Sequence, residues 1–162
     1  MNVNYLNPFI EASQNVIKDI TGLDSKLEKV YLRGNSFDGD EIIIIIGLTG
    51  ALVGHVMLTL NVSTMDIIVK EMYAGDANNL DEDLKRSAMA ELANMIVGNA
   101  SNLFYKRGMK VFITTPTIMT GKKIVISNKY PIICIPLEVG GNGGSLEINI
   151  SAIENETKEY KM

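Results

Sequence analysis

Residues 41–60 read EIIIIIGLTGALVGHVMLTL, and this stretch decides the fold class. The five consecutive isoleucines at 42–46 favour a strand, because β-branched side chains pack well on a pleated surface. Such a dense apolar run predicts a strand that is buried on both faces. Thr49 and Gly50 interrupt the pattern, and residues 54–60 then predict the returning strand of a hairpin.

Helical signals lie on both sides of this hairpin. Helices are expected at residues 8–20, 64–73 and 82–107. Asn7 and Asp81 are the expected N-caps of the first and last of them, and Gly22 and Gly108 are the expected stops. The acidic first turn and basic last turn of the long helix complement its dipole.

The other segments are strand-like. Strands are expected at 27–35, 110–115, 123–127, 132–139 and 145–150, with a turn at 37–40. Strands interrupted by helices predict an α+β fold, with a largely antiparallel sheet covered by helices on one face. Residues 1–152 are expected to form a single domain, and the polar residues 153–162 a frayed tail. The apolar segments 132–137 and 146–150 would need edge protection or pairing.

Composition limits the classes of function. The chain has 162 residues, of which 46% are hydrophobic and 21% charged, as in a globular domain. A net charge of -4 disfavours nucleic-acid binding, which needs a basic face. The longest apolar run is far shorter than the ~20 residues that cross a bilayer. Without an export signal or a pair of cysteines, the chain is expected in the cytoplasm.

Several familiar sites are absent. Gly121-Lys122-Lys123 lacks the Ser or Thr that follows the lysine of a phosphate-binding loop. The single histidine, His55, and the single cysteine, Cys134, cannot build a Cys/His zinc site. Their apolar neighbours predict a structural histidine and a core thiol.

The long helix carries an unusual polar stripe. Its apolar face is formed by Leu92, Met95, Ile96, Ala100 and Leu103. Ser87, Glu91, Asn94 and Gly98 share a second arc of roughly 60°. The simplest interpretation is a polar outer face with an i,i+3 hydrogen bond between Glu91 and Asn94. Alternatively, a carboxylate and a carboxamide without a nucleophile can position a water and hold a partner's charge, and Gly98 would let that partner approach closely.

The spacing of this stripe carries a resemblance. Ser87-x-x-x-Glu91-x-x-Asn94, followed after twenty-one residues by Pro116, resembles the signature of the CheC/CheX/FliY family of chemotaxis phosphatases. The stretch 91–100 (ELANMIVGNA) and residues 114–117 (TTPT) match it closely. CheC-type members carry two such helices. The first helix here has Gln14 three residues after Glu11, so the single motif copy is similar to CheX-type members.

The resemblance implies a partner and a mechanism. The substrate would be a phosphorylated CheY-type receiver, whose own aspartate carries the phosphoryl group and whose own site holds Mg²⁺, so that this chain needs no cofactor. Glu91 would pair with the receiver's active-site lysine, and the amide oxygen of Asn94 would aim a water at phosphorus. Ser87 and Pro116 are carried over only as motif positions, with capping or helix packing for Ser87 and a strand-end turn for Pro116. The resemblance also implies a homodimer joined edge to edge.

Two other functions stay open. A non-catalytic receiver-binding or scaffold module would bind the same partner without turning it over. A small-molecule sensor is less favoured, because aromatic residues make up only 6% of the chain and tryptophan is absent. The sequence leaves the identity of the receiver open.

Overall fold

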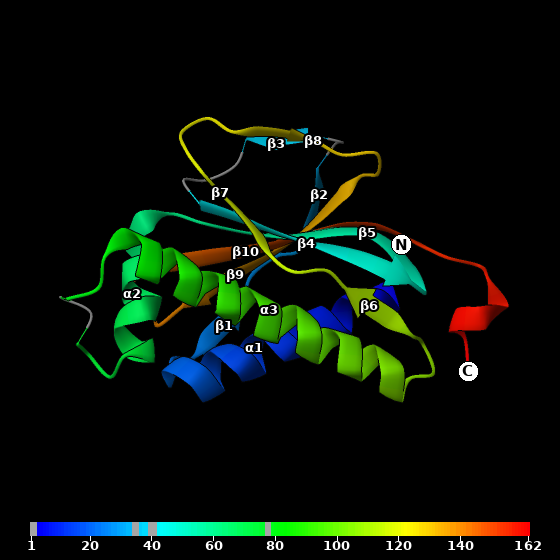
Figure 1. Ribbon diagram of the computed structural model, residues 1–162, viewed down its shortest axis with the longest axis horizontal. Coiled ribbons are helices and arrows are strands. Elements are labelled where there is room, and N and C mark those ends of the chain that lie inside the picture. Colours follow the sequence, from blue (N-terminus) through cyan, green and yellow to red (C-terminus); the bar gives the residue numbers. More distant parts are fainter. Residues whose placement is uncertain (1–2, 34–35, 39–41, 77–78) are drawn as a thin grey trace.

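The computed structural model describes residues 3–33, 36–38, 42–76 and 79–162. In this part of the chain, helices cover one face of a twisted sheet, and a short two-stranded ribbon stands over the other face (Figure 1). The helices are α1 (Leu6–Thr21), α2 (Val62–Met72) and α3 (Glu82–Lys106), with 3₁₀ turns at Val3–Tyr5 and Lys158–Tyr160. The first five strands are β1 (Ser25–Leu27), β2 (Tyr31–Arg33), β3 (Ser36–Asp38), β4 (Ile42–Gly50) and β5 (Leu52–Leu60). The others are β6 (Val111–Ile113), β7 (Thr117–Thr120), β8 (Val125–Ser127), β9 (Ile132–Val139) and β10 (Gly144–Glu154).

The main sheet is antiparallel throughout the described residues. Its order is β1-β9-β10-β5-β4-β6, with β2 also beside β9 and β7 also beside β4. β4 and β5 form the predicted hairpin, in which Ile44 lies opposite Leu58. The predicted α+β architecture, with one long helix over a largely antiparallel sheet, is therefore confirmed.

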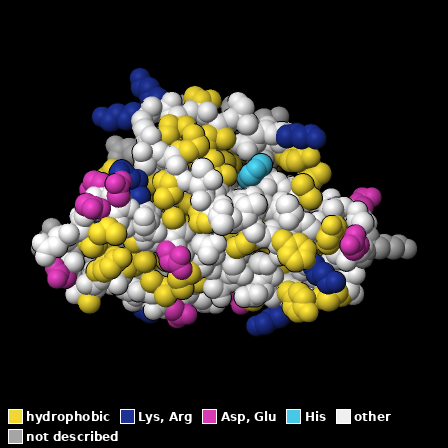
Figure 2. All heavy atoms as spheres, viewed as in Figure 1, with side chains coloured by type: hydrophobic (Ala, Val, Ile, Leu, Met, Phe, Trp, Pro, Cys, Tyr) yellow, Lys and Arg dark blue, Asp and Glu magenta, His cyan; other side chains and the backbone are white. Residues whose placement is uncertain are grey.

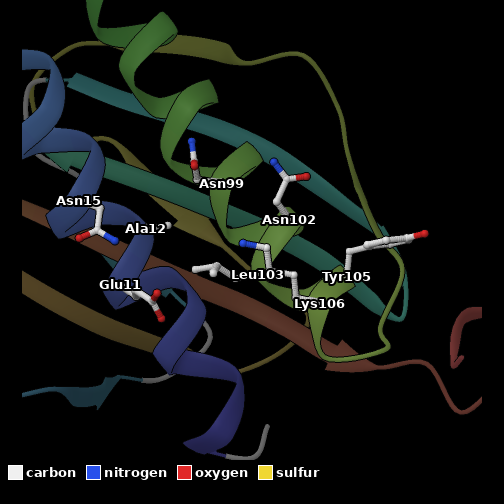
Figure 3. A pocket seen from close by; sticks show the side chains of 8 residues that line it. All are labelled: Glu11, Ala12, Asn15, Asn99, Asn102, Leu103, Tyr105 and Lys106. Atoms are coloured by element: carbon white, nitrogen blue, oxygen red, sulfur yellow. The ribbon is translucent and has the colours of Figure 1, made fainter.

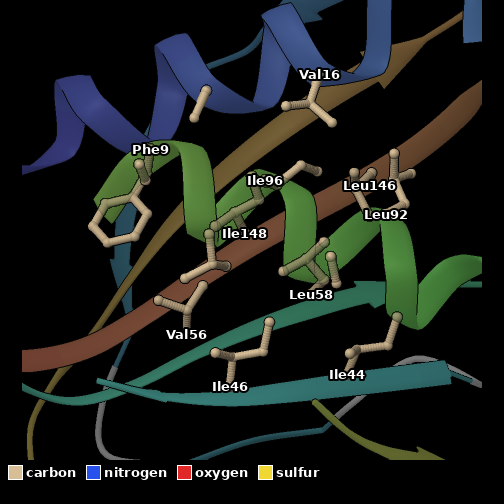
Figure 4. Packing of buried hydrophobic residues seen from close by; sticks show 14 of the residues in the cluster. Phe9, Val16, Ile44, Ile46, Val56, Leu58, Leu92, Ile96, Leu146 and Ile148 are labelled. Carbon is tan, nitrogen blue, oxygen red and sulfur yellow. The ribbon is translucent and has the colours of Figure 1, made fainter. Parts of the chain in front are cut away.

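The isoleucine run is buried on both faces, as predicted. Its inward-facing members, Ile44 and Ile46 among them, belong to the main core together with Leu92 and Ile96 of α3. Figure 4 shows side chains of α1 and α3 pointing toward those of the sheet. Ile43 faces the other way and is fully buried in a second cluster with Met57, Ile132 and Cys134, against Ile124 and Ile126. Each such burial stabilises the fold by about 1.5–3 kcal/mol, so the strand is held from both sides.

The predicted helix ends are largely confirmed. The Asp81 side chain accepts a hydrogen bond from the Leu84 N–H at 2.8 Å, which fixes where α3 begins. Gly22, with φ of 73°, ends α1 in a left-handed conformation that glycine adopts without strain. The predicted N-cap Asn7 is wrong, because a 3₁₀ turn leads into α1 and the helix already begins at Leu6.

Three other predictions differ from the structure. The expected strand at 27–35 is divided into β1 and β2, and β7 was not predicted, because Pro116 interrupts the pattern before it. Of the expected turn at 37–40, Phe37 and Asp38 lie in β3, and the other positions lie outside the described residues. The apolar segments 132–137 and 146–150, which were expected to need edge protection or pairing, are paired: β9 and β10 each have neighbours on both sides, which explains their apolar character.

The C-terminal segment is more ordered than a frayed tail. β10 continues to Glu154 along β5, so it extends past residue 153, where the polar tail was expected to begin. The Tyr160 carbonyl then accepts a hydrogen bond from the Lys110 N–H at 2.9 Å, and the Met162 N–H donates to the Gly108 carbonyl at 2.8 Å. These backbone bonds hold the end of the chain against the segment that follows α3.

Candidate functional site

α3 presents the predicted stripe to the outside of the molecule. Its buried face, which includes Leu92 and Ile96, packs on the sheet. On the opposite side, Ser87 and Glu91 are exposed, whereas Asn94 and Gly98 are half-buried. One helix therefore brings these four motif residues onto a single accessible face, in the middle of its length.

The two polar side chains at the centre of the stripe are not engaged. Within the described ranges, neither the Glu91 carboxylate nor the Asn94 amide makes a hydrogen bond or an ion pair, so the simple i,i+3 bond between them is not formed. Polar groups elsewhere on α3 are paired: Arg86 donates to Asp83 at 2.7 Å, and the Asn99 amide donates to the Met95 carbonyl at 2.8 Å. An unengaged carboxylate and amide, side by side, leave donors and acceptors ready for another molecule.

Gly98 keeps the surface beside Asn94 low. A Cβ atom at this position would meet only the Ile113 Cδ1 atom, at 3.8 Å, an ordinary van der Waals contact. The fold therefore does not require glycine here, although glycine in a helix interior costs roughly 1 kcal/mol relative to alanine. A glycine that lowers helix stability without a packing reason is consistent with a binding surface that a partner molecule approaches closely.

Pro116 lies in a break of the strand that runs beside α3. β6 and β7 pair with successive parts of β4, and residues 114–116 separate them. Thr114 fastens this break: its N–H donates to the Gly47 carbonyl at 3.0 Å, and its Oγ1 accepts from the Gly47 N–H at 2.8 Å. Pro116 lies directly before β7, outside the paired residues of β6 and β7, so its missing N–H removes no pairing of the sheet; it begins a strand segment rather than ending one.

Ser87 does not have the expected role. It lies inside α3, beyond the cap at Asp81, and its side chain is exposed. It therefore neither caps nor packs the helix, and it belongs to the accessible stripe.

The first helix lacks an equivalent free amide. Gln14, three residues after Glu11, donates its Nε2 to the Ser25 carbonyl at 3.2 Å. Glu11 instead lines a groove of about 440 Å³ between α1 and α3, together with Asn15 and Asn99 (Figure 3). Because Glu11 and Asn15 lie in this groove, α1 offers no second copy of the α3 stripe.

The single histidine and cysteine have different surroundings. Cys134 is fully buried in the second cluster, and burial raises the pKa of its thiol, so the predicted core thiol is confirmed. His55 was predicted as a satisfied structural histidine inside a strand. It does lie in β5, but its side chain is exposed, on the face of β5 that points away from the helices. Strand alternation explains the difference, since its neighbours Val56 and Leu58 take the buried positions.

The described residues contain neither a cluster of metal ligands nor a membrane-spanning helix. No group of three or more His, Cys, Asp or Glu side chains in it is arranged to hold a metal ion. None of its described helices is long and apolar enough to cross a membrane.

The sequence matches a known family over most of its length. Residues 42–138, which include the hairpin, α3 and Pro116, match the family described as chemotaxis phosphatase CheX. The chain belongs to this family. The assignment confirms the predicted family and the predicted phosphatase class.

Relatives support the assignment. The CheY-P phosphatase CheX of Thermotoga maritima is 27% identical over 139 residues, covering 86% of this chain and 90% of the relative. The crystal structure of a chemotaxis protein CheX from Desulfovibrio desulfuricans has a TM-score of 0.81 at 25% identity, covering 94% of this chain and 100% of that one. The CheX chain in a CheX-CheY-BeF₃-Mg²⁺ complex from Borrelia burgdorferi has a TM-score of 0.77 at 23% identity, covering 94% and 100%. At that identity, the likeness to the Borrelia protein shows the fold alone.

Two exposed aromatic residues were not singled out from the sequence. Tyr105, near the end of α3, is 58% exposed, and Phe112 on β6 is 54% exposed. The signal for Tyr105 is its spacing, since it follows Glu91 and Gly98 at intervals of seven residues. No spacing pattern in the sequence singles out Phe112, because it lies on β6 and comes close to Tyr105 only in the folded protein.

Proposed function

We propose that this chain dephosphorylates the phospho-aspartate of a CheY-type receiver, with Asn94 orienting the attacking water and Glu91 holding the receiver. Membership of the CheX family carries the proposal, and the unengaged Glu91 and Asn94 on an accessible helix face support it. The T. maritima relative is a CheY-P phosphatase, and the Borrelia relative was crystallised with CheY, BeF₃ and Mg²⁺.

In the hydrolysis of the acyl phosphate, this chain needs only to position the attacking water and the receiver. The acyl phosphate is on the receiver, and the bond that breaks joins phosphorus to the aspartate oxygen. A water oxygen attacks phosphorus in line, the aspartate carboxylate leaves, and the water proton passes to phosphate or solvent. Phosphoryl transfer depends mainly on alignment and charge neutralisation, so one carboxamide that holds the water is a sufficient contribution from the phosphatase.

Asn94 and Glu91 have separate roles in this scheme. The Asn94 carbonyl oxygen accepts a hydrogen bond from the water and fixes its direction, whereas the carboxylate of Glu91 attracts the cationic lysine of the receiver. Mg²⁺ is held by the receiver and supplies charge neutralisation there. This chain brings no cofactor of its own.

The test compares the release of inorganic phosphate from an acetyl-phosphate-charged, Mg²⁺-bound CheY-type receiver, with and without the protein. Asn94→Ala should abolish the acceleration but retain binding to the BeF₃-loaded receiver. Glu91→Lys should weaken binding, because it places like charges together. Asn99→Ala makes the same substitution five residues further along α3, toward the groove with α1. Glu71→Lys makes the same charge change at an exposed position of α2. Both control variants should behave as the wild type.

Other results would redirect the proposal. If the wild type binds the receiver without accelerating hydrolysis, the α3 stripe is a docking surface of a non-catalytic module. If Asn94→Ala and Glu91→Lys both keep the wild-type rate, the assigned site is wrong.

We also propose a cytoplasmic location, where receivers act, and retain the homodimer as a prediction. In the described residues the open sides of the sheet are β1 with β2, and β6 with β7. Leu32 on β2 is 70% exposed, which favours the first of these edges for pairing. Light scattering of Leu32→Lys beside the wild type tests this: a monomer from a wild-type dimer would support the β2 edge.

A further inference from the structure

The exposed face of α3 has apolar ends and a polar centre. Leu84, Glu91, Gly98 and Tyr105 follow one another at seven-residue intervals, so they lie nearly in line, about 10.5 Å apart, with a drift of only about 20° per step. Leu84 at one end is 49% exposed, and Tyr105 at the other is 58% exposed. The polar stripe is thus bracketed by two large apolar side chains that the core does not use.

The Tyr105 end of this line is hollowed. Tyr105 and Phe112 are two walls of a depression of about 400 Å³, which Ser101, Asn102, Lys110 and Val111 also line. Figure 2 shows hydrophobic side chains over β6 and the C-terminal part of α3, with basic side chains beside them. Figure 3 shows the Tyr105 ring pointing away from α1, so this depression is separate from the groove between the helices.

The β6 wall of the depression is held in place. The Phe112 ring packs edge-on against Tyr160, with centroids 6.5 Å apart. Ser101 donates a hydrogen bond to the Val111 carbonyl, and this joins α3 to β6. The Phe112 wall is therefore fixed before binding, so it loses little conformational entropy when a side chain enters the depression, which is the property of an interface anchor.

The length of this line matches the width of a small compact domain. Asn94 is ten residues from Leu84 and eleven from Tyr105, or about 15 Å and 16.5 Å along the helix axis. A compact domain of 100 residues has a radius of gyration of about 13 Å and is therefore about 30 Å across. A receiver of about this size, centred over Asn94, would cover both ends of the line.

We propose that the depression between Tyr105 and Phe112 is a second docking contact for the receiver and accepts an apolar side chain from its surface. This inference rests on the proposed function, since it names where the same partner is held. The contact lies about 16 Å from Asn94, too far to touch the reacting atoms. It acts on the affinity and orientation of the receiver, and Tyr105 and Phe112 determine which receivers bind well.

The experiment measures KM and kcat for the phosphorylated receiver, and Kd for the BeF₃- and Mg²⁺-loaded receiver. Tyr105→Ala and Phe112→Ala should each raise KM and Kd about tenfold, the effect expected of an aromatic anchor, with kcat within twofold of wild type. Val125→Ala removes a 63% exposed apolar side chain from β8 and serves as the matched control, with no expected change. Tyr105→Lys keeps the test valid if Phe112→Ala unfolds, because Tyr105 is an exposed helix residue whose replacement the fold tolerates.

The outcomes separate this inference from the proposed function. An active wild type whose Tyr105→Ala and Tyr105→Lys variants keep the wild-type KM and Kd overturns the docking contact and leaves the phosphatase assignment standing. A fall in kcat at unchanged KM also overturns it, as does a change of oligomeric state in the variants, which would assign this surface to a second copy of the chain. A wild type that does not accelerate hydrolysis, but binds the receiver through Tyr105, overturns the proposed function alone.

Discussion

Gly98→Ala should make the protein more stable and a poorer phosphatase. Gly98 lies in the interior of α3, and the added Cβ would stand 3.8 Å from the Ile113 Cδ1 atom, without a clash. Alanine is favoured over glycine in a helix interior by about 0.8–1.0 kcal/mol. For a chain of this length, 1 kcal/mol raises Tm by about 2–4 °C. A thermal unfolding scan measures this gain.

The same methyl group should interfere with the receiver. It would rise from the line between Glu91 and Tyr105, one turn from Asn94, where the receiver must approach closely. A displacement of the order of 1 Å can cost a hundredfold in rate, so we expect kcat/KM to fall at least about tenfold in the phosphate-release assay. The control Asn99→Ala gains about 0.5 kcal/mol of helix propensity but loses the hydrogen bond to the Met95 carbonyl, so its stability should change little. Its activity should be unchanged, because Asn99 lines the groove with α1.

Either half of this prediction can fail separately. A lower Tm for Gly98→Ala would show that the added methyl group clashes with Ile113, contrary to the spacing given above. A higher Tm with wild-type kcat/KM would show that the low surface beside Asn94 has no part in receiver binding, and the reason given for a glycine at this position would be wrong.

Three further predictions concern the scaffold. Asp81→Ala should cost about 1 kcal/mol in urea unfolding, because it removes the hydrogen bond to the Leu84 N–H that begins α3. Gly54→Ala should destabilise the fold by about 3 kcal/mol or prevent folding. The reason is that φ of Gly54 is 151° and the new Cβ would lie 2.1 Å from the Ser151 carbonyl oxygen. Soluble yield and Tm measure this loss of stability. Burial and a hydrogen bond to Glu147 raise the pKa of Tyr31 to about 12, so its contribution to stability should be complete below pH 10 and lost between about pH 10 and 12. Urea midpoints at pH 9 and pH 11 should therefore differ less in Tyr31→Phe than in the wild type.

The elements that the sequence predicted well are those with strong local signals. Five isoleucines in a row could form little other than a buried strand, and Asp81 and Gly108 mark the ends of α3 by cap chemistry that acts within one turn. β7 and the order of the C-terminal tail depend instead on distant partners. β7 exists because it pairs with β4, and residues 158–162 are held by the segment after α3, which local patterns cannot indicate.

His55 shows a limit of reasoning from neighbours alone. Its apolar flanks suggested a satisfied structural histidine, but a strand has two faces, and the alternation puts His55 on the side away from Val56 and Leu58, where it is exposed. The ribbon of β3 and β8 and the residues packed with it cover only part of that outer face, around Ile43 and Met57. Which part of a sheet is covered is decided by the tertiary fold, so the sequence pattern was ambiguous at this position.

The candidate site could be predicted from local patterns, unlike the exposure of His55, because its residues share one helix. Ser87, Glu91, Asn94 and Gly98 are placed by helical periodicity alone, so the sequence predicted their common face correctly. Enzyme sites are usually recognised by a deep pocket, a metal cluster or a nucleophile beside its base, but Glu91 and Asn94 stand unengaged on an exposed helix face. If the receiver supplies the aspartate, the metal ion and the lysine, as we propose, those signs belong to the receiver and arise only in the complex. On the phosphatase, such a shared site would show only three features. They are the two unengaged side chains, a glycine beside them that the packing does not require, and the depression between Tyr105 and Phe112, about 16 Å away.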